Sequence, residues 1–421
     1  MQGTLPRSRL VSAPADGNRK QENAMQSNAQ SAVTPVSPEV LKQRARDIVP
    51  RLVERAAQAD EQRRVPDETI RDLQEAGLFR VLQPKAYGGY EMDPQVFYDI
   101  AMILSEGCMS TGWIYGIIGV HNWQLALFDP RAAEDVWKED TGTLVASTYM
   151  PKGQVTPVEG GFKFSGRWGF SSGIDHCEWV LLGGLIFNEG QPPEYRTFLV
   201  PRSDFRVEDT WHTMGLKGTG SNDIIVEDAF VPEYRTHKAA DGFAGTNPGG
   251  DTFTSPLYKI PFGQIFVRAV SSAAIGALSG AVNEFRNWAT DWTGNMGSKT
   301  AEQAPAQLAV AEAMTTVDEL KLILHRNFEE ILDGIRQNKP VSVERRLHFR
   351  YQAAQVVDRC AERVSRLMAA AGGRSIFTDF PVQRHFLDIH TARAHYANNA
   401  HMFGSNFGGV MMGRDNTDFF I

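Results

Sequence analysis

The hydrophobic pattern changes twice along the chain, and this change constrains the fold more than any other feature. From residue 37 to about 140, apolar residues recur at helical spacing. From 141 to 235 they form short runs of β-branched and aromatic residues separated by Gly, Pro and Asp. From 262 to 400 the helical spacing returns. The sequence therefore predicts an α+β protein in which a β-domain stands between two helical domains.

The N-terminal helical domain is predicted to span residues 37–140. Pro50 lies inside its first periodic segment, so we expect a kink or a break there. A second helix is expected to end at Gly77, since glycine suits the left-handed conformation at a helix C-terminus. Residues 94–128 are apolar on all sides, which is typical of buried helices.

The remaining boundaries follow from composition. Residues 141–235 are predicted to form an antiparallel β-domain or barrel. Residues 236–258 are poor in apolar residues and rich in glycine, and we interpret them as a surface loop. Residues 259–421 are predicted to form a C-terminal helical bundle. Residues 1–36 are rich in Gln, Asn, Ser, Ala and Pro, which predicts a disordered tail.

The charge and the cysteine content exclude several classes of protein. The net charge is about -7, so no general attraction to nucleic acid or to an anionic membrane is expected. No stretch approaches the roughly 20 uninterrupted apolar residues of a membrane span, and the N-terminus lacks the apolar core of a signal peptide. The three cysteines are odd in number and far apart, which argues against a disulfide framework. We expect a cytoplasmic protein.

Several stretches together resemble one family. They are "RRVPDETIRDLQEAGLFRVLQPKAYGG", "STGWIYGIIGVHNWQLALFD", "RWGFSSGIDHCEW", "MGLKGTGSNDIIVEDAFVP" and "QRHFLDIHTARAH". Over roughly residues 37–400 they are similar to the acyl-CoA dehydrogenase fold. Within that fold they most resemble the oxygenase components of two-component, reduced-flavin-dependent aromatic hydroxylases.

The resemblance implies a cofactor, partners and a reaction. Such a protein takes reduced FMN (FMNH2) or FADH2 from a separate NAD(P)H-dependent flavin reductase and forms a flavin C4a-hydroperoxide with O2. It then hydroxylates a small phenolic or other aromatic substrate, and it assembles as a homotetramer. The glycine-rich "GLKGTGSN" lacks the strand–GxGxxG–helix setting of a nicotinamide site, which agrees with a separate reductase.

The resemblance also implies roles for residues around the flavin. Ser171 occupies the place of a hydroxyl that donates toward the flavin N5 edge, and Ser172 stands next to it. The alternative is a plain Ser-Ser-Gly turn. Trp113 is expected to form a wall of the pocket by stacking. Ser147 stands in a segment where the family carries consecutive serines beside the flavin, and here Ala146 replaces the first of them.

Two further residues are expected to face the substrate. Tyr149 follows Ser147 closely and offers a hydroxyl. His121 lies eight residues after Trp113, so the two share roughly one face of a helix. His121 then either bonds a substrate oxygen or is a histidine satisfied within the core.

Four of the ten histidines lie in residues 384–401, and the first three are spaced by five. A step of five turns a helix by about 140°, so His385, His390 and His395 do not share a face and a metal site is not expected. The resemblance makes His395 the base that accepts the phenol proton and binds the substrate. A neutral imidazole is suited to that work. His390 and Asp388 are assigned to packing, and His385 and His401 to the surface.

Three alternatives stay open from the sequence. The segment "HYAN", residues 395–398, lacks the carboxylate with which many acyl-CoA dehydrogenases remove a proton. An acyl-CoA dehydrogenase with a relocated base would bind FAD stably. A monooxygenase that oxidises nitrogen, sulfur or indole would not need the base. A non-catalytic flavin-binding homologue would show no oxygen chemistry.

Overall fold

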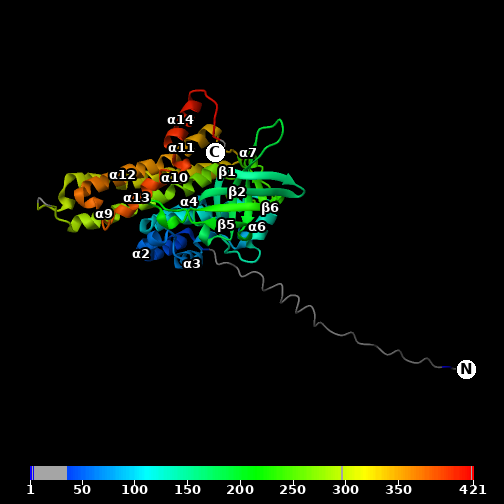
Figure 1. Cartoon of the computed structure of the whole chain (residues 1–421), viewed down its shortest axis with the longest axis horizontal. Helices are drawn as coiled ribbons and strands as arrows, with labels where there is room; N and C mark the ends of the chain where they lie inside the picture. Colours follow the sequence, from blue (N-terminus) through cyan, green and yellow to red (C-terminus); the bar gives the residue numbers. More distant parts are fainter. Residues whose placement is uncertain (2, 4–35, 295–296, 419) are drawn as a thin grey trace. The chain divides into compact units, whose positions relative to one another are not determined.

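The computed structural model describes residues 36–294, 297–418, 420 and 421, together with residues 1 and 3 (Figure 1). Residues 37–421 form one compact unit. The predicted disordered tail, residues 1–36, lies almost wholly outside the described residues.

The N-terminal region is helical, as predicted. Its helices are α2 (Pro38–Gln62), α3 (Asp67–Glu75), α4 (Pro94–Gly107), α5 (Met109–Gln124) and α6 (Pro130–Trp137). Helix α2 continues through Pro50 without the break that the sequence suggested. Its inward face is buried on both sides of the proline, at Ile48 and Leu52, and this packing holds the helix together. Gly77 has φ 74°, in the left-handed region, as expected after α3.

Helix α5 is the central element of the fold. Every one of its residues is buried, which confirms the interpretation of the apolar stretch. It is separated from α4 by Cys108, whose extended backbone (φ -157°) ends one helix and begins the next. Helix α5 contacts α4, the C-terminal helices α8 and α9, and strand β1. A side chain on α5 therefore faces both helical regions and the sheet.

The β-domain is an open mixed sheet and not an antiparallel barrel. Its seven strands are β1 (Val145–Val158), β2 (Gly161–Ser171), β3 (Trp179–Ile186), β4 (Glu194–Pro201), β5 (Phe205–Glu208), β6 (Asn222–Pro232) and β7 (Thr236–Lys238). Their order across the sheet is β5-β6-β2-β1-β3-β4-β7. Strands β1 and β3 pair in parallel, and β5 and β7 remain as separate edges. The barrel prediction is wrong because strand texture indicates strands but not their partners.

The segment 236–258 is not a loop throughout. It begins with β7, which pairs with β4, and continues into α7 (Ala239–Ala244). The segment then returns to the N-terminal region, where the Gly249 N–H donates to the carbonyl oxygen of Leu127 at 3.3 Å.

The C-terminal region is a bundle of long helices. They are α8 (Phe262–Ala269), α9 (Ser272–Asp291), α10 (Ala304–Arg336), α11 (Val343–Ala354), α12 (Val356–Ala371), α13 (Gln383–Ala392) and α14 (Ala400–Met411). The stretch Phe262–Asp291 is long and apolar enough to cross a membrane, but 89% of its most apolar window is buried inside the protein. It therefore serves as the core of the bundle.

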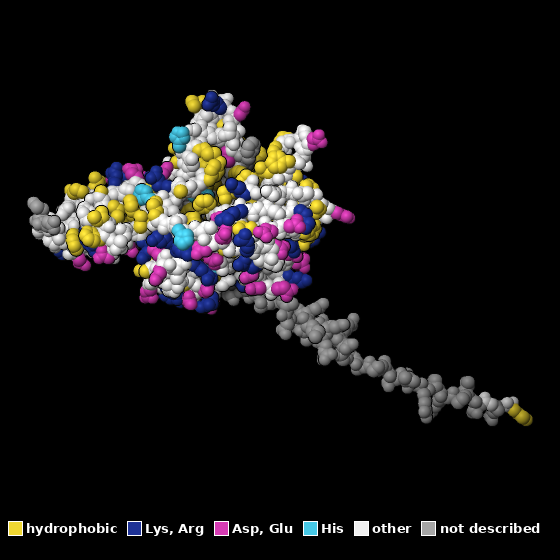
Figure 2. Space-filling view, in the orientation of Figure 1, with side chains coloured by type: hydrophobic (Ala, Val, Ile, Leu, Met, Phe, Trp, Pro, Cys, Tyr) yellow, Lys and Arg dark blue, Asp and Glu magenta, His cyan; other side chains and the backbone are white. Residues whose placement is uncertain are grey.

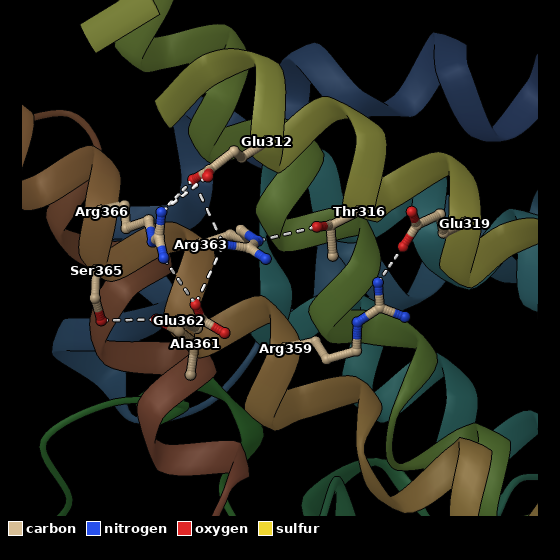
Figure 3. A network of polar contacts seen from close by, with 9 residues as sticks. All are labelled: Glu312, Thr316, Glu319, Arg359, Ala361, Glu362, Arg363, Ser365 and Arg366. Carbon is tan, nitrogen blue, oxygen red and sulfur yellow. Dashed lines mark hydrogen bonds and ion pairs between the residues drawn. The ribbon is translucent and has the colours of Figure 1, made fainter. Parts of the chain in front are cut away.

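Ion pairs fasten α12 to α10 (Figure 3). Arg366 on α12 binds Glu312 on α10 at 2.7 Å, and the neighbouring Arg363 donates to the Thr316 hydroxyl at 3.1 Å. Each of these arginines points at a partner on the facing helix, so we read this network as structural.

Candidate active site

The sequence-predicted residues Trp113, Ser172 and His395 lie together, where α5 meets the end of β2 and the segment after α13. The Trp113 indole Nε1–H donates to the Ser172 hydroxyl at 3.2 Å. The Trp113 ring meets the His395 ring edge-on, with centroids 5.8 Å apart and planes at 69°. Three segments far apart in the chain thus bring an indole, a hydroxyl and an imidazole to one place.

Ser171 is fully buried and almost free of partners. Its hydroxyl donates to the carbonyl oxygen of Ser147, but the 3.5 Å distance makes this hydrogen bond weak. The preceding Phe170 has φ 65°, a left-handed conformation that costs a non-glycine residue free energy. Such strain is found where the backbone must present a particular side chain, and here it precedes the Ser171 hydroxyl.

The ring of His395 is held in one orientation by its own backbone. Its Nδ1 accepts a hydrogen bond from the Ala397 N–H at 3.1 Å, at the start of the short helix η11 (Tyr396–Asn398). In the neutral ring the proton therefore resides on Nε2. The protein packed around the ring, and next the Arg350 guanidinium, lower the pKa of His395 to about 4. The imidazole is neutral at physiological pH, and Nε2–H is its available donor.

A buried arginine stands behind His395. Arg350 donates to the carbonyl oxygen of Ala397 at 2.9 Å and lies 3.5 Å from the carboxylate of Asp418. Its guanidinium carbon is 3.3 Å from the centroid of the Phe403 ring. Burial lowers the pKa of Arg350 to about 10, so it stays cationic at neutral pH. The sequence reasoning missed Arg350, because nothing in the spacing links α11 to residue 395.

Tyr149 and His121 form a second group beside the first. Their ring centroids are 6.2 Å apart, and the Tyr149 ring packs edge-on against Phe262 and Phe266. The Tyr149 hydroxyl donates to the side chain of Gln124, so it already has a partner. The structure places Trp113 and His121 against different neighbours, although both lie on α5.

His121 is a fully buried imidazole without a hydrogen bond. Neither ring nitrogen has a partner among the described residues. Burial lowers its pKa to about 3, so the ring is neutral. Buried polar atoms are nearly always paired, so the ring nitrogens of His121 are available to a polar group of a bound molecule.

The other histidines follow the expectations with one correction. His385 is buried and not at the surface, because α13 packs against α9 and brings its Nε2 to 3.6 Å from Glu284. His390 lies 3.0 Å from the Ser365 hydroxyl, in keeping with packing, and His401 is exposed. Within the described residues, no cluster of His, Cys, Asp and Glu is placed to hold a metal ion.

A surface depression lies elsewhere, on the C-terminal helices. It has a volume of about 450 Å³, sits at the C-terminal end of α9 and is lined by Trp288, Trp292 and Glu284, among others. None of the residues that line it belongs to the groups around Trp113 and His121.

Two domain families match the helical regions of the chain. Residues 37–128 match the acyl-CoA dehydrogenase N-terminal domain, and residues 269–400 match the acyl-CoA dehydrogenase C-terminal domain. These matches agree with the two helical regions of the fold.

Relatives match nearly the whole chain. The oxygenase subunit HsaA of a flavin-dependent monooxygenase from Rhodococcus jostii is 37% identical over 85% of this chain and 94% of its own length. The oxygenase component of p-hydroxyphenylacetate 3-hydroxylase from Acinetobacter baumannii is 32% identical over 91% of this chain and 92% of its own. The crystal structure of 3-HSA hydroxylase from Rhodococcus sp. RHA1 superposes with a TM-score of 0.85 at 35% identity, over 90% of this chain and 99% of that one.

Proposed function

The chain belongs to the oxygenase components of the two-component flavin-dependent monooxygenases, and from this we propose that it hydroxylates a phenol whose oxygen is held by His395. Its class of reaction is the hydroxylation of an aromatic, phenolic ring with reduced flavin and O2, and it requires a flavin reductase as partner. The acyl-CoA dehydrogenase matches describe the fold, whereas the relatives above 30% identity over most of the chain are hydroxylases and monooxygenases.

The residues around Trp113 fit a reduced flavin. The Ser171 hydroxyl is buried and nearly unpartnered, so it has a hydrogen bond to offer, and it directly follows the strained backbone of Phe170. Trp113, which bonds the next residue, Ser172, offers a flat aromatic surface. Bound there, a reduced flavin would activate O2 and supply one oxygen atom to the ring. The chain's own work is to hold that flavin with Ser171 and Trp113 in a site shielded from water.

The observation that carries the proposal is the hydrogen bond from Ala397 N–H to His395 Nδ1. It fixes the proton on Nε2, so His395 reaches a substrate oxygen as a donor. A base at Nε2 would need the proton on Nδ1, where the Ala397 N–H already points. Geometry and the pKa of about 4 therefore favour a donor that holds a phenolate oxygen over the predicted proton acceptor.

Arg350 strengthens this role through its charge. The positive charge of Arg350 near the imidazole favours negative charge on a substrate oxygen bound to His395 Nε2. The phenolate form of a substrate carries a more electron-rich ring than the phenol, and such a ring attacks an electrophilic oxygen more readily. Burial, and next the charge of Arg350, keep His395 neutral, and the charge of Arg350 also favours the reactive form of the substrate.

The choice of variant at His395 separates donor from base. The Nε2 amide of glutamine can replace the imidazole Nε2–H as a donor but cannot accept a proton. With NADH, a flavin reductase, FMN or FAD, and a panel of phenols, we expect His395→Gln to retain at least a tenth of the hydroxylated product per flavin oxidised. We expect His395→Ala to lose more than nine-tenths.

Equal and complete loss in both variants would contradict the donor role. Full activity in both would remove His395 from the site. Running each assay with FMN and with FAD also decides the flavin preference.

We further propose a cytoplasmic homotetramer formed through the C-terminal helices. Helix α10 carries the exposed apolar residues Leu308, Met314 and Leu322, with exposed fractions of 58%, 48% and 71%. Figure 2 shows hydrophobic side chains gathered over this helical end of the molecule. Exposed apolar residues of this kind favour burial against another copy. Sedimentation of the wild type and of Leu322→Lys tests the assembly; a variant that sediments like the wild type would argue against this face.

A further inference from the structure

A line of buried hydroxyl groups leads away from the Trp113 indole. The Trp113 Nε1–H donates to the Ser172 hydroxyl at 3.2 Å. The Ser172 and Ser221 oxygens are 2.8 Å apart, and the Ser221 and Thr219 oxygens are 2.7 Å apart. The Thr219 hydroxyl donates to the carbonyl oxygen of Leu216 at 2.8 Å. All five residues are buried.

The two ends of this line fix its direction. An indole N–H can only donate and a carbonyl oxygen can only accept. Ser172 therefore accepts from Trp113 and donates to Ser221, which in turn donates to Thr219. Each hydroxyl is both donor and acceptor, and chains of this kind strengthen their own members.

The far end of the line is anchored in the C-terminal bundle. The Leu216 N–H donates to the Asp388 carboxylate on α13 at 2.6 Å, and the Leu216 carbonyl also accepts from the Trp211 indole at 2.9 Å. Leu216 has φ 50°, a left-handed conformation that persists only where its surroundings fix it. Here the hydrogen bonds to its N–H and to its carbonyl oxygen hold it.

We propose that Ser221 and Thr219 are positioning residues, which hold the Trp113 indole against His395 and direct the Ser172 proton away from the cofactor. The inference rests on the proposed function for its catalytic consequence. Helix α13 ends three residues before His395. The line of hydroxyl groups therefore connects Trp113, through Leu216 and Asp388, to the helix that precedes His395. Both rings are then placed from the same helix.

The line also distinguishes the two adjacent serines. Ser172 gives its proton to Ser221 and one lone pair to Trp113, so no proton remains for a flavin. Ser171 has only a 3.5 Å bond to a carbonyl and is the one free to donate. The proposal therefore gives Ser172 a supporting role through Trp113, whereas the sequence predicted that it binds the cofactor.

Fluorine NMR of protein labelled with 5-fluorotryptophan reads the indole directly, and Trp113→Phe assigns its resonance. We expect Ser221→Ala to shift or broaden the Trp113 resonance. In the reductase-coupled assay we expect it to lower the ratio of hydroxylated product to hydrogen peroxide at least threefold. Ser221→Thr, which keeps the hydroxyl, should restore both readouts.

Two further variants complete the design. Thr219→Val keeps the shape of the residue but removes the next hydroxyl, and it serves if Ser221→Ala fails to fold. Ser279→Ala removes a hydroxyl that bonds Glu106 on a different helix and should change neither readout.

An unmoved Trp113 resonance with a wild-type product ratio in Ser221→Ala would overturn the proposal. If the wild type hydroxylates none of the phenols, the proposed function fails, while the fluorine shift still decides whether the line holds Trp113.

Discussion

Asp388 allows a sharp test of the electrostatics beneath the site. Its side chain is 1% exposed, one carboxylate oxygen accepts from the Leu216 N–H, and the other has no partner among the described residues. Burial raises its pKa from 3.8 to about 7, against the lowering effect of the Leu216 N–H. The folded protein therefore prefers the protonated acid more strongly than the unfolded chain does.

The sign and size of the effect follow by linkage. A folded-state pKa above the unfolded one stabilises the protein fully below about pH 4, and this stabilisation is lost as the pH rises through about 7. The shift corresponds to about 4 kcal/mol in total. Asp388→Asn removes the charge but keeps an oxygen that accepts from the Leu216 N–H. Its stability advantage over the wild type should grow by about 2.5 kcal/mol between pH 5 and pH 8.

Urea unfolding followed by circular dichroism, at equal protein concentration and at pH 5, 6, 7 and 8, measures this difference. Asp251→Asn removes the same charge at an exposed position and serves as the matched control. The contrary result is a difference in free energy of unfolding between Asp388→Asn and the wild type that stays constant to within about 0.5 kcal/mol from pH 5 to pH 8. That result would show that the carboxylate is not desolvated, and the reasoning would be wrong.

Three further outcomes are expected. Hydroxylation should show no loss from titration of His395 between pH 8 and pH 5, because its pKa lies at about 4, and a pH profile shared by the wild type and His395→Gln would support this. Because burial lowers the pKa of His121 to about 3, unfolding takes up a proton below about pH 6.5, so acid should lower the urea midpoint of the wild type more than that of His121→Phe. The double variant Arg350→Met, Asp418→Asn removes the buried ion pair and should raise the pKa of bound 4-nitrophenol, as read from its visible absorbance. An unchanged pKa would show that the charge of Arg350 does not act on the substrate.

Local patterns predicted the elements but not their partners. Helical periodicity indicated both helical regions, and the all-apolar stretch correctly predicted the buried α5. The parallel pairing of β1 with β3 depends on contacts distant in sequence, so the antiparallel prediction failed. At Pro50 the expected break did not occur, because tertiary packing along α2 outweighed a local rule, and the alternative of a kink stays a prediction.

The site was predicted in part for the same reason. Trp113, Ser172 and His395, three of the predicted site residues, lie together, and their roles stay predictions. Its supporting groups come from elsewhere: Ser221 lies in a glycine-rich segment where a hydroxyl carries no signal, and Arg350 lies on a separate helix. The Ala397 N–H that orients His395 is only two residues away, and a histidine immediately before a short helix was a usable sign of it.

The open sheet leaves two edges at which strands of another copy of the protein could pair. Its edge strands are only four and three residues long, and the part of β6 that extends beyond β5 carries the exposed charges of Glu227 and Asp228, with Asp228 at φ 51°. Short, charged and irregular edges offer few backbone groups in line for another strand. We therefore expect no fibre growth by strand pairing between copies at these edges.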